Sequence, residues 1–188
     1  MARGISISVA PQFYVLLAGM CVLIPLPWVM GWILAAMLHE LFHCLAIWLC
    51  GMKISYLHIG PDGAKIGAGD LSGSQSVLCA LAGPFGGLFT ACVGGLFPQL
   101  SICAAVQSMY NLLPVYPLDG GRALLGISHL LLSKSTADIL CRTVEMLTFT
   151  VLFLLALIAG FVWNFGCLPV FLIAAFIIKM RIIKRPCK

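Results

Sequence analysis

The amino-acid sequence predicts an all-α polytopic membrane protein with about six transmembrane helices, a broken fourth element and a small interfacial β-hairpin. Of its 188 residues, 62% are hydrophobic and 9% are charged, and the mean hydropathy is +1.09. In soluble domains, charged residues make up about 25% of the chain. The apolar residues gather in long segments, which one polar connection interrupts. So much apolar surface requires lipid as its solvent, which places the chain among membrane proteins.

The apolar segments follow one another closely, so we expect a single intramembrane domain over residues 1–188. Pro25 and Pro27 end the first segment and permit a tight hairpin into the second. Pro114 and Pro117 interrupt the fourth, which predicts an unwound stretch at membrane depth. The expected spans cover about 10–26, 28–50, 75–97, 100–132, 139–160 and 165–183.

The polar connection between the second and third spans, residues 53–76, predicts a β-hairpin. Residues 53–59 mix polar and apolar side chains as a strand does, the Pro-Asp-Gly sequence at 61–63 is typical of a turn, and residues 64–68 form the returning strand. Two roles are open to it. The hairpin either caps the bundle at the membrane interface or pairs its edge with an extended segment of another protein.

Basic residues gather on one expected side of the membrane and contribute most of the net charge of +5. They are Arg3, Lys53, Lys65 and Lys134, followed by the tail residues Lys179, Arg181, Lys184, Arg185 and Lys188. The turns expected on the other side, near 27, 98–100 and 161–164, contain no Lys or Arg. This asymmetry predicts that both termini are cytoplasmic. The tail suits contact with anionic lipid; nucleic acid is not expected as a partner, because neither aromatic interleaving nor a soluble fold accompanies it.

The segment His39-Glu40-Leu41-Phe42-His43 lies inside one of the most apolar stretches of the chain. On a helix, this HExxH pattern brings two imidazoles to one face, where they can share a zinc ion, with the glutamate beside the metal as a base for bound water. A charged group near a membrane helix centre costs roughly 2.5–3.5 kcal/mol on insertion scales. A lone histidine would indicate an interhelical hydrogen bond, but this pair with its glutamate predicts a metal site.

A catalytic zinc site needs a third protein ligand and an open position for water. The remaining acids are Asp62, Asp70, Asp119, Asp138 and Glu145. Of these, Asp119 alone lies in an otherwise uncharged run just past the expected break, and Gly120 and Gly121 after it permit close backbone approach. We therefore predict Asp119 as the third ligand. The alternative is an N-cap of the following helix, and His58 and His129 are reserve candidates for the ligand.

Two motifs stand out in order along the chain, HELFH at 39–43 and NLLPVYPLDGGR at 111–122, with Ala82-Gly83-Pro84 between them. Together they resemble the site-2 protease family of intramembrane zinc metalloproteases. The likeness is closest to the short branch typified by the stage IV sporulation factor that processes a sigma-factor precursor. Where many members carry a polar residue after the Gly-Pro pair, this chain has Gly86-Gly87.

The resemblance implies that His39, His43 and Asp119 ligate zinc and that Glu40 is the general base. It also implies that Asn111 helps to position substrate or to stabilise the developing oxyanion. An alternative role for Asn111 is to satisfy backbone groups that the break at Pro114 leaves free.

The predicted enzyme is a zinc metalloendopeptidase that cleaves a membrane-associated or membrane-tethered protein by zinc-activated water, with Glu40 as base. The resemblance implies regulated proteolysis in a bacterial plasma membrane, with a sigma-factor precursor as a candidate substrate and sporulation as a possible setting. The expected partners are that substrate and the lipid bilayer, and an inhibitory membrane protein is a further possibility.

Two other functions compete with proteolysis. A membrane metal-ion transporter also uses clusters of His and Asp, but it needs ligands and no base beside them. An inactive homologue that only binds membrane clients would have no use for an intact base and an intact ligand set. The base at Glu40 therefore favours hydrolysis over both alternatives.

Overall fold

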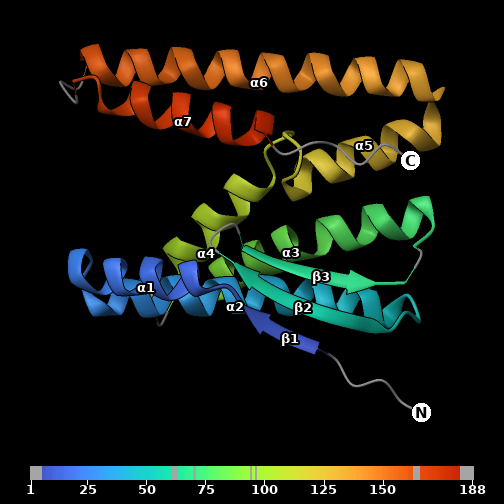
Figure 1. Cartoon of the computed structure of the whole chain (residues 1–188), viewed down its shortest axis with the longest axis horizontal. Helices are drawn as coiled ribbons and strands as arrows, with labels where there is room; N and C mark the ends of the chain where they lie inside the picture. The colour runs from blue at the N-terminus through green and yellow to red at the C-terminus, as the bar shows by residue number, and fades with distance from the viewer. Residues whose placement is uncertain are drawn as a thin grey trace. The chain divides into compact units, whose positions relative to one another are not determined.

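A computed structural model of the chain describes residues 6–60, 63–69, 71–93, 95, 97–162 and 166–182. Within these residues the chain folds into seven helices and a small three-stranded sheet (Figure 1). Two compact units follow one another in the sequence; the first ends at Asn111 and the second begins at Leu112. A mostly helical fold with one small sheet agrees with the predicted class, whereas a single domain over 1–188 stays a prediction.

Prolines determine where the first two helices begin and end. Helix α1 (Pro11–Leu23) begins with Pro11, whose missing N–H and restricted φ suit a first helical turn. It ends just before Pro25, and α2 (Leu26–Leu49) begins after Pro25 with Pro27 in its own first turn. The break expected between the first two apolar segments is therefore confirmed.

The sheet of the first unit has the order β1-β2-β3. Strands β2 (Ile54–Gly60) and β3 (Gly63–Ala68) pair antiparallel, with Gly60 opposite Gly63. Gly63 has φ 104°, a backbone conformation that favours glycine. The predicted hairpin is thus confirmed for its two strands, while Pro61 and Asp62 in its turn lie outside the described residues.

Strand β1 (Ser6–Val9) was not expected from the sequence. It pairs parallel to β2, and the Ser8 hydroxyl and the His58 Nδ1 atom share a hydrogen bond of 2.8 Å across the pair. Four residues are too few for a periodic signal of their own. Pairing with a strand that lies about fifty positions later in the chain makes this segment a strand, so the sheet is mixed rather than a simple hairpin.

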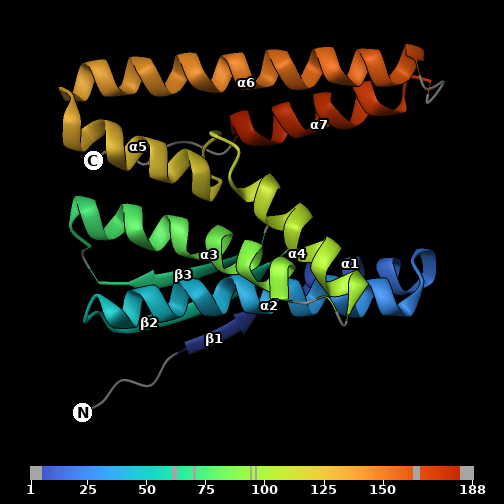
Figure 2. The ribbon, with the colours of Figure 1, turned by 180° about the vertical axis from the view of Figure 1, so that it is seen from behind.

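Helices α3 (Gly73–Val93) and α4 (Pro98–Asn111) lie against α2 in the first unit (Figures 1 and 2). Small residues take part in both contacts. One cluster joins Ala35 of α2 to two residues of α4, and another joins α2 to Cys79 of α3. Small side chains let helix backbones approach closely, which is the main source of helix association in lipid.

The second unit contains α5 (Asp119–Leu131), α6 (Lys134–Val162) and α7 (Leu168–Ile182). The irregular segment 112–118 precedes α5, so the predicted interruption of the fourth apolar element is confirmed. The core of this unit joins that segment to α6 and α7. It consists of Val115, Phe149 and Met180.

Among the residues that the structure describes, three helices are long and apolar enough to cross a membrane: α2, α3 and α6. Two shorter apolar helices cover Pro11–Leu23 and Leu168–Met180. Helices α4 and α5 have 14 and 13 residues, or about 20 Å each, against a hydrocarbon core of about 30 Å. The apolar helices indicate an integral membrane protein, while six full spans and the cytoplasmic termini stay predictions; Arg3 and the tail from residue 183 onward lie outside the described residues.

Candidate metal centre

The two histidines of HELFH lie one turn apart on the same face of α2, as the spacing predicts. Their Nε2 atoms are 3.1 Å apart, and the two rings meet edge to face with centroids 4.8 Å apart. Two nitrogens bound to one tetrahedral zinc lie about 3.3 Å apart, because each Zn–N bond is about 2.0–2.1 Å long. His39 is buried and His43 is half-buried. The pair therefore already has the separation that a shared ion requires.

A backbone carbonyl determines the tautomer of His43. Its Nδ1 atom lies 2.7 Å from the carbonyl oxygen of Cys79 on α3. A carbonyl oxygen can only accept, so Nδ1 carries the proton and Nε2 of the neutral ring keeps its lone pair. This is the form that a metal ligand needs, and a backbone carbonyl is a usual partner for the other ring nitrogen. A cation between the two Nε2 atoms would bind the lone pair that His43 directs toward His39.

Gly83 of α3 lies directly against the two Nε2 atoms. A Cβ atom at this position would lie 2.2 Å from Nε2 of His43 and 2.7 Å from Nε2 of His39, far closer than any real contact. Only glycine therefore lets the α3 backbone pack beside the imidazole edges. The sequence marked this residue as part of Ala82-Gly83-Pro84, and the structure supplies the physical reason for it.

Asp119 is the first residue of α5 in the second unit and is buried. The N-cap of this helix is Leu118, which makes no side-chain cap hydrogen bond, so Asp119 does not have the alternative N-cap role. A Cβ on Gly120 would lie 2.1 Å from the Leu112 carbonyl oxygen, and one on Gly121 would lie 2.4 Å from the Val115 carbonyl carbon. The two glycines thus let the first turn of α5 pack on the irregular backbone that precedes it.

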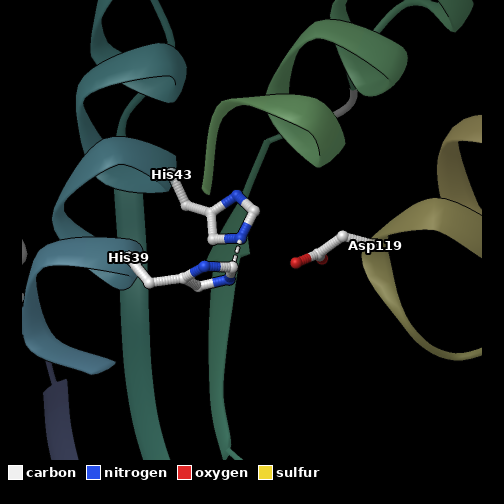
Figure 3. A group of neighbouring side chains, drawn as sticks. All are labelled: His39, His43 and Asp119. Carbon is white, nitrogen blue, oxygen red and sulfur yellow. Dashed lines mark hydrogen bonds between the residues drawn. The ribbon is translucent and has the colours of Figure 1, made fainter. Parts of the chain in front are cut away.

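His39, His43 and Asp119 form a group of possible metal ligands. These three residues are of the kinds that together could hold a metal ion, and Figure 3 draws the imidazole pair of α2 and the Asp119 carboxylate of α5. Two imidazole nitrogens and one carboxylate oxygen are a donor set that zinc accepts in catalytic sites. The three residues that the sequence singled out are thus a possible metal site, and their roles as ligands, like the choice of zinc, stay a prediction.

Two further residues that the sequence predicted, Asn111 and Glu40, lie next to the histidine pair. Asn111 ends α4, and its Nδ2 atom lies 3.5 Å from Nε2 of His39. Glu40 is half-buried and follows His39 directly in α2. Asn111 thus lies beside the imidazole pair because α4 packs on α2, and Glu40 because it is next to His39 in the same helix; the roles of both stay predictions.

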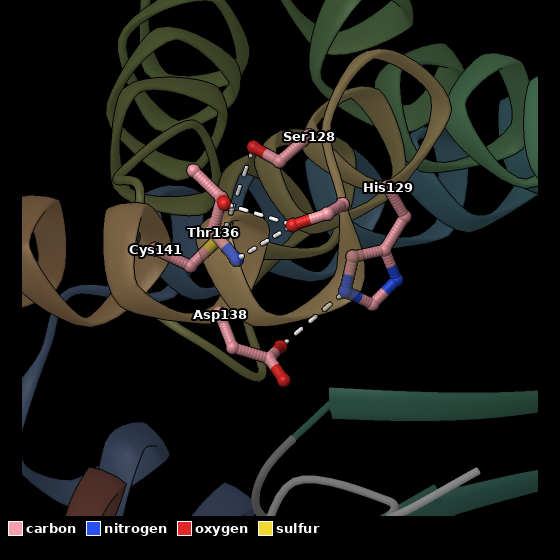
Figure 4. Close-up of polar contacts among 6 residues, drawn as sticks. Ser128, His129, Thr136, Asp138 and Cys141 are labelled. Carbon is pink, nitrogen blue, oxygen red and sulfur yellow. Dashed lines mark hydrogen bonds and ion pairs between the residues drawn. The ribbon is translucent and has the colours of Figure 1, made fainter.

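The two reserve histidines lie elsewhere. His58 is bonded to Ser8 in the sheet. His129 of α5 lies 3.3 Å from the Asp138 carboxylate of α6, at the point where Figure 4 shows several polar contacts between these helices. Both partners of this contact are more than a third exposed. Among the acids, Asp62 and Asp70 lie outside the described residues, so Asp119 is the acid that the described structure groups with the histidine pair.

Two contributions to the site were not foreseen. The Cys79 carbonyl holds a ligand ring, but a backbone acceptor has no residue-type signal, so the sequence could not have identified it. The second is Gln107 of α4, whose Nε2 atom donates a hydrogen bond of 2.9 Å to the Trp32 carbonyl of α2. A glutamine in an apolar stretch four residues before Asn111 was the available signal.

No protein-family model matches the chain, and no curated protein is similar to it. Among solved structures, the chain is similar to the site-2 protease from Methanocaldococcus jannaschii, with 17% sequence identity and a TM-score of 0.58. The match covers 100% of this chain and 95% of that one. The branch of the stage IV sporulation factor is not shown by this likeness. The chain thus shares the fold of a site-2 protease over its whole length, and His39, His43 and Asp119 are possible metal ligands within it.

Proposed function

We propose that the protein is an intramembrane zinc metalloendopeptidase that cleaves a membrane-tethered protein. The observation that carries the proposal is the histidine pair. The two Nε2 atoms lie 3.1 Å apart on an apolar helix long enough to span a membrane, and the Cys79 carbonyl holds one ring in the metal-binding tautomer. The grouping of Asp119 with this pair and the likeness to a site-2 protease support the same function.

Each residue has a separate task in this reaction. His39, His43 and Asp119 hold zinc and leave a position open. When bound, zinc lowers the pKa of water toward about 7 and polarises the scissile carbonyl. Glu40 accepts the proton of the attacking water and returns it to the leaving amine. The place of Glu40 in the helix, one residue after the first imidazole and three before the second, supports this role.

Asn111 supplies an amide donor beside the centre. Its Nδ2 atom is directed at the imidazole edge of His39, 3.5 Å from Nε2. A donor at this place suits an oxygen that gains negative charge next to the metal. The alternative task, satisfying backbone groups freed near Pro114, would direct the amide toward the irregular segment, and the contact with His39 favours the first role.

We propose that the substrate reaches the centre as an extended segment. A transmembrane helix hides its carbonyls in its own hydrogen bonds, so it must unwind before a peptide bond is accessible to water. Strand β3 ends the sheet order, and no further strand pairs with its outer edge among the residues that the structure describes. Such an edge can accept an extended peptide by strand addition. Removal of residues 61–68 should abolish capture of substrate while zinc content stays normal.

Replacement of the base tests the whole mechanism. Glu40→Gln keeps the shape of the side chain and removes the proton acceptor, so cleavage of a co-expressed single-span substrate should fall by about 10²- to 10⁴-fold. The zinc content of the purified variant should equal that of the wild type. Glu145→Gln, which changes a half-buried glutamate of α6, is the matched control and should cleave normally.

Two results would contradict the proposal. The first is cleavage at the wild-type rate by Glu40→Gln, because this result would show that Glu40 is not the general base. The second is metal uptake into vesicles that follows expression of the protein while no candidate substrate is cleaved. That result would favour the metal-ion transporter, since transport needs ligands and no base.

A further inference from the structure

Helix α4 contacts α2 with every fourth residue along one ridge. The backbone of Gln99 lies against Gly31, where an added Cβ would come within 3.0 Å of it. One turn later the Cys103 thiol lies 3.9 Å from a carbonyl of α2. Gln107 and Asn111 continue the ridge toward the imidazole pair. Residues four apart share one face of a helix, so this ridge sets where the end of α4 lies beside α2.

The two contacts at the end of the ridge differ in length. Gln107 donates to the Trp32 carbonyl at 2.9 Å, an ordinary length for an amide hydrogen bond, whereas Asn111 reaches His39 at 3.5 Å, the limit for such a bond. The longer contact is weak and cannot hold α4 in place by itself. The shorter one connects a buried amide to the backbone of α2, which moves only with the whole helix. Of these two polar contacts, the one made by Gln107 is therefore the stronger connection between α4 and α2, and Asn111 lies one turn beyond it.

The burial of Gln107 requires this hydrogen bond. The residue is 8% exposed, and an amide buried without a partner carries a large desolvation cost. Trp32 and His39 are seven residues apart, two helical turns, and thus lie on the same face of α2. Gln107 and Asn111 are one turn apart on α4. The same two helix faces therefore carry both the anchor at Trp32 and the metal-binding ring at His39.

We propose that Gln107 is a positioning residue, which anchors α4 to the Trp32 carbonyl and thereby holds the Asn111 amide beside the His39 imidazole. This inference rests on the proposed metalloprotease function. Gln107 bonds to the Trp32 carbonyl and acts neither as a metal ligand nor as a substrate contact. Its effect is transmitted through Asn111, because a displacement of about 1 Å at a reacting centre can lower a rate by about 100-fold.

A double-mutant cycle tests the inference. Gln107→Met keeps the length of the unbranched side chain and removes the donor. In the wild-type background it should lower kcat by about 10- to 100-fold at unchanged KM and zinc content, measured on a single-span model peptide with a central Pro-Gly in detergent micelles. In an Asn111→Ala background the same substitution should cause no further loss, because the residue through which it acts is gone.

A spectroscopic version of the cycle does not depend on cleavage. With Co2+ in place of zinc, Asn111→Ala should alter the visible absorption of the site, Gln107→Met should shift it in the same direction, and the double variant should match Asn111→Ala. Gln99→Met is the matched control, since Gln99 lies against Gly31 with its backbone and Cβ, which Met keeps, and it should change neither spectrum nor kcat.

The outcomes separate this inference from the proposed function. If Gln107→Met lowers kcat equally with and without Asn111, or leaves both kcat and the Co2+ spectrum unchanged, Gln107 is not a positioning residue although the protein remains a metalloprotease. If the wild type binds neither Zn2+ nor Co2+, the proposed function itself fails. If it binds metal without cleaving the model peptide, the Co2+ cycle alone decides the role of Gln107.

Discussion

Two helix contacts within the protein follow different rules. Around the imidazole pair, α2, α3 and α4 meet one another through glycines, small side chains and backbone carbonyls. Gly31 and Gly83 lie at contacts with or on α2, Gly87 lies between α3 and α4, and the Cys79 and Trp32 carbonyls accept hydrogen bonds across these contacts. In the second unit, α6 and α7 meet through large apolar side chains. Phe149 and Phe176 lie edge to face, with ring centroids 6.2 Å apart, beside Met180.

The two contacts differ because one packs only apolar side chains, whereas the other also positions polar atoms. Lipid is as apolar as a leucine side chain, so helices in a membrane associate through close packing and hydrogen bonds rather than by burial from water. The α6–α7 contact requires only that apolar side chains fill the space between the helices, so similar apolar side chains can replace one another there. The contacts around the imidazoles must bring polar atoms to defined positions. Every glycine in that region is therefore expected to be intolerant, and the predictions below test this contrast.

The largest effect is expected at Gly83. In Gly83→Ala, the new methyl group would overlap the Nε2 atoms of both histidines, so zinc binding should be lost altogether. Gly19→Ala is the matched control on α1, because a Cβ there meets nothing within 4 Å. The control should bind zinc normally and should gain about 0.5–1 kcal/mol in stability from the better helix former. Zinc stoichiometry by elemental analysis and thermal unfolding distinguish the two variants.

The next largest effect is expected at Asp119. Asp119→Asn keeps the size of the side chain and removes its charge, so zinc affinity should fall by more than about 100-fold, the upper range for residues that only support a ligand. Asp138→Asn changes an exposed acid near His129 and should leave zinc affinity unchanged. Competition with a chromogenic chelator measures both affinities. Equal affinity for Asp119→Asn and wild type would remove Asp119 from the ligand set.

A smaller loss of stability, which a second substitution should restore, is expected at Gly87. A Cβ there would lie 2.1 Å from the Ser108 hydroxyl oxygen but 3.5 Å from the Ser108 Cβ, an ordinary contact. Gly87→Ala should therefore destabilise the protein by about 1–3 kcal/mol, as overpacked cores do. Adding Ser108→Ala removes the overlapping oxygen and should restore most of the loss. If the second substitution restores nothing, the clash lies elsewhere and the close α3–α4 contact is incorrect.

The smallest effect is expected in the α6–α7 contact. Phe149→Leu removes part of a buried ring, yet it keeps an apolar side chain in an apolar contact. It should lower stability by less than about 1.5 kcal/mol, comparable to other apolar swaps, and should leave zinc stoichiometry unchanged. Circular dichroism on heating in detergent and elemental analysis measure the two effects. A complete loss of zinc in this variant would contradict the contrast between the two contacts.

Some elements were predictable because their signals are local. Pro25 and Pro27 mark the turn between α1 and α2, Pro114 and Pro117 mark the interruption before α5, and the hairpin strands show their own alternation. In each case the cause lies within a few residues of its effect. The HELFH motif is of the same kind, because helical periodicity alone brings residues 39 and 43 to one face.

Other features were not predictable because their causes are distant in the sequence. Strand β1 exists through pairing with β2, and the tautomer of His43 depends on a carbonyl 36 residues later. The lengths of the helices on either side of the predicted interruption were likewise not predictable. Only the observed ends show that it separates two helices of 14 and 13 residues.

The sequence by itself determined that the chain is apolar enough for a membrane, that two histidines share a helix face and that the fourth apolar element is interrupted. These properties follow from composition, from the 3.6-residue period and from the missing N–H of proline. The tertiary structure alone decided which backbone carbonyl orients His43 and why residue 83 must be glycine. Both depend on how closely α3 approaches α2, a distance that no local pattern of residues encodes.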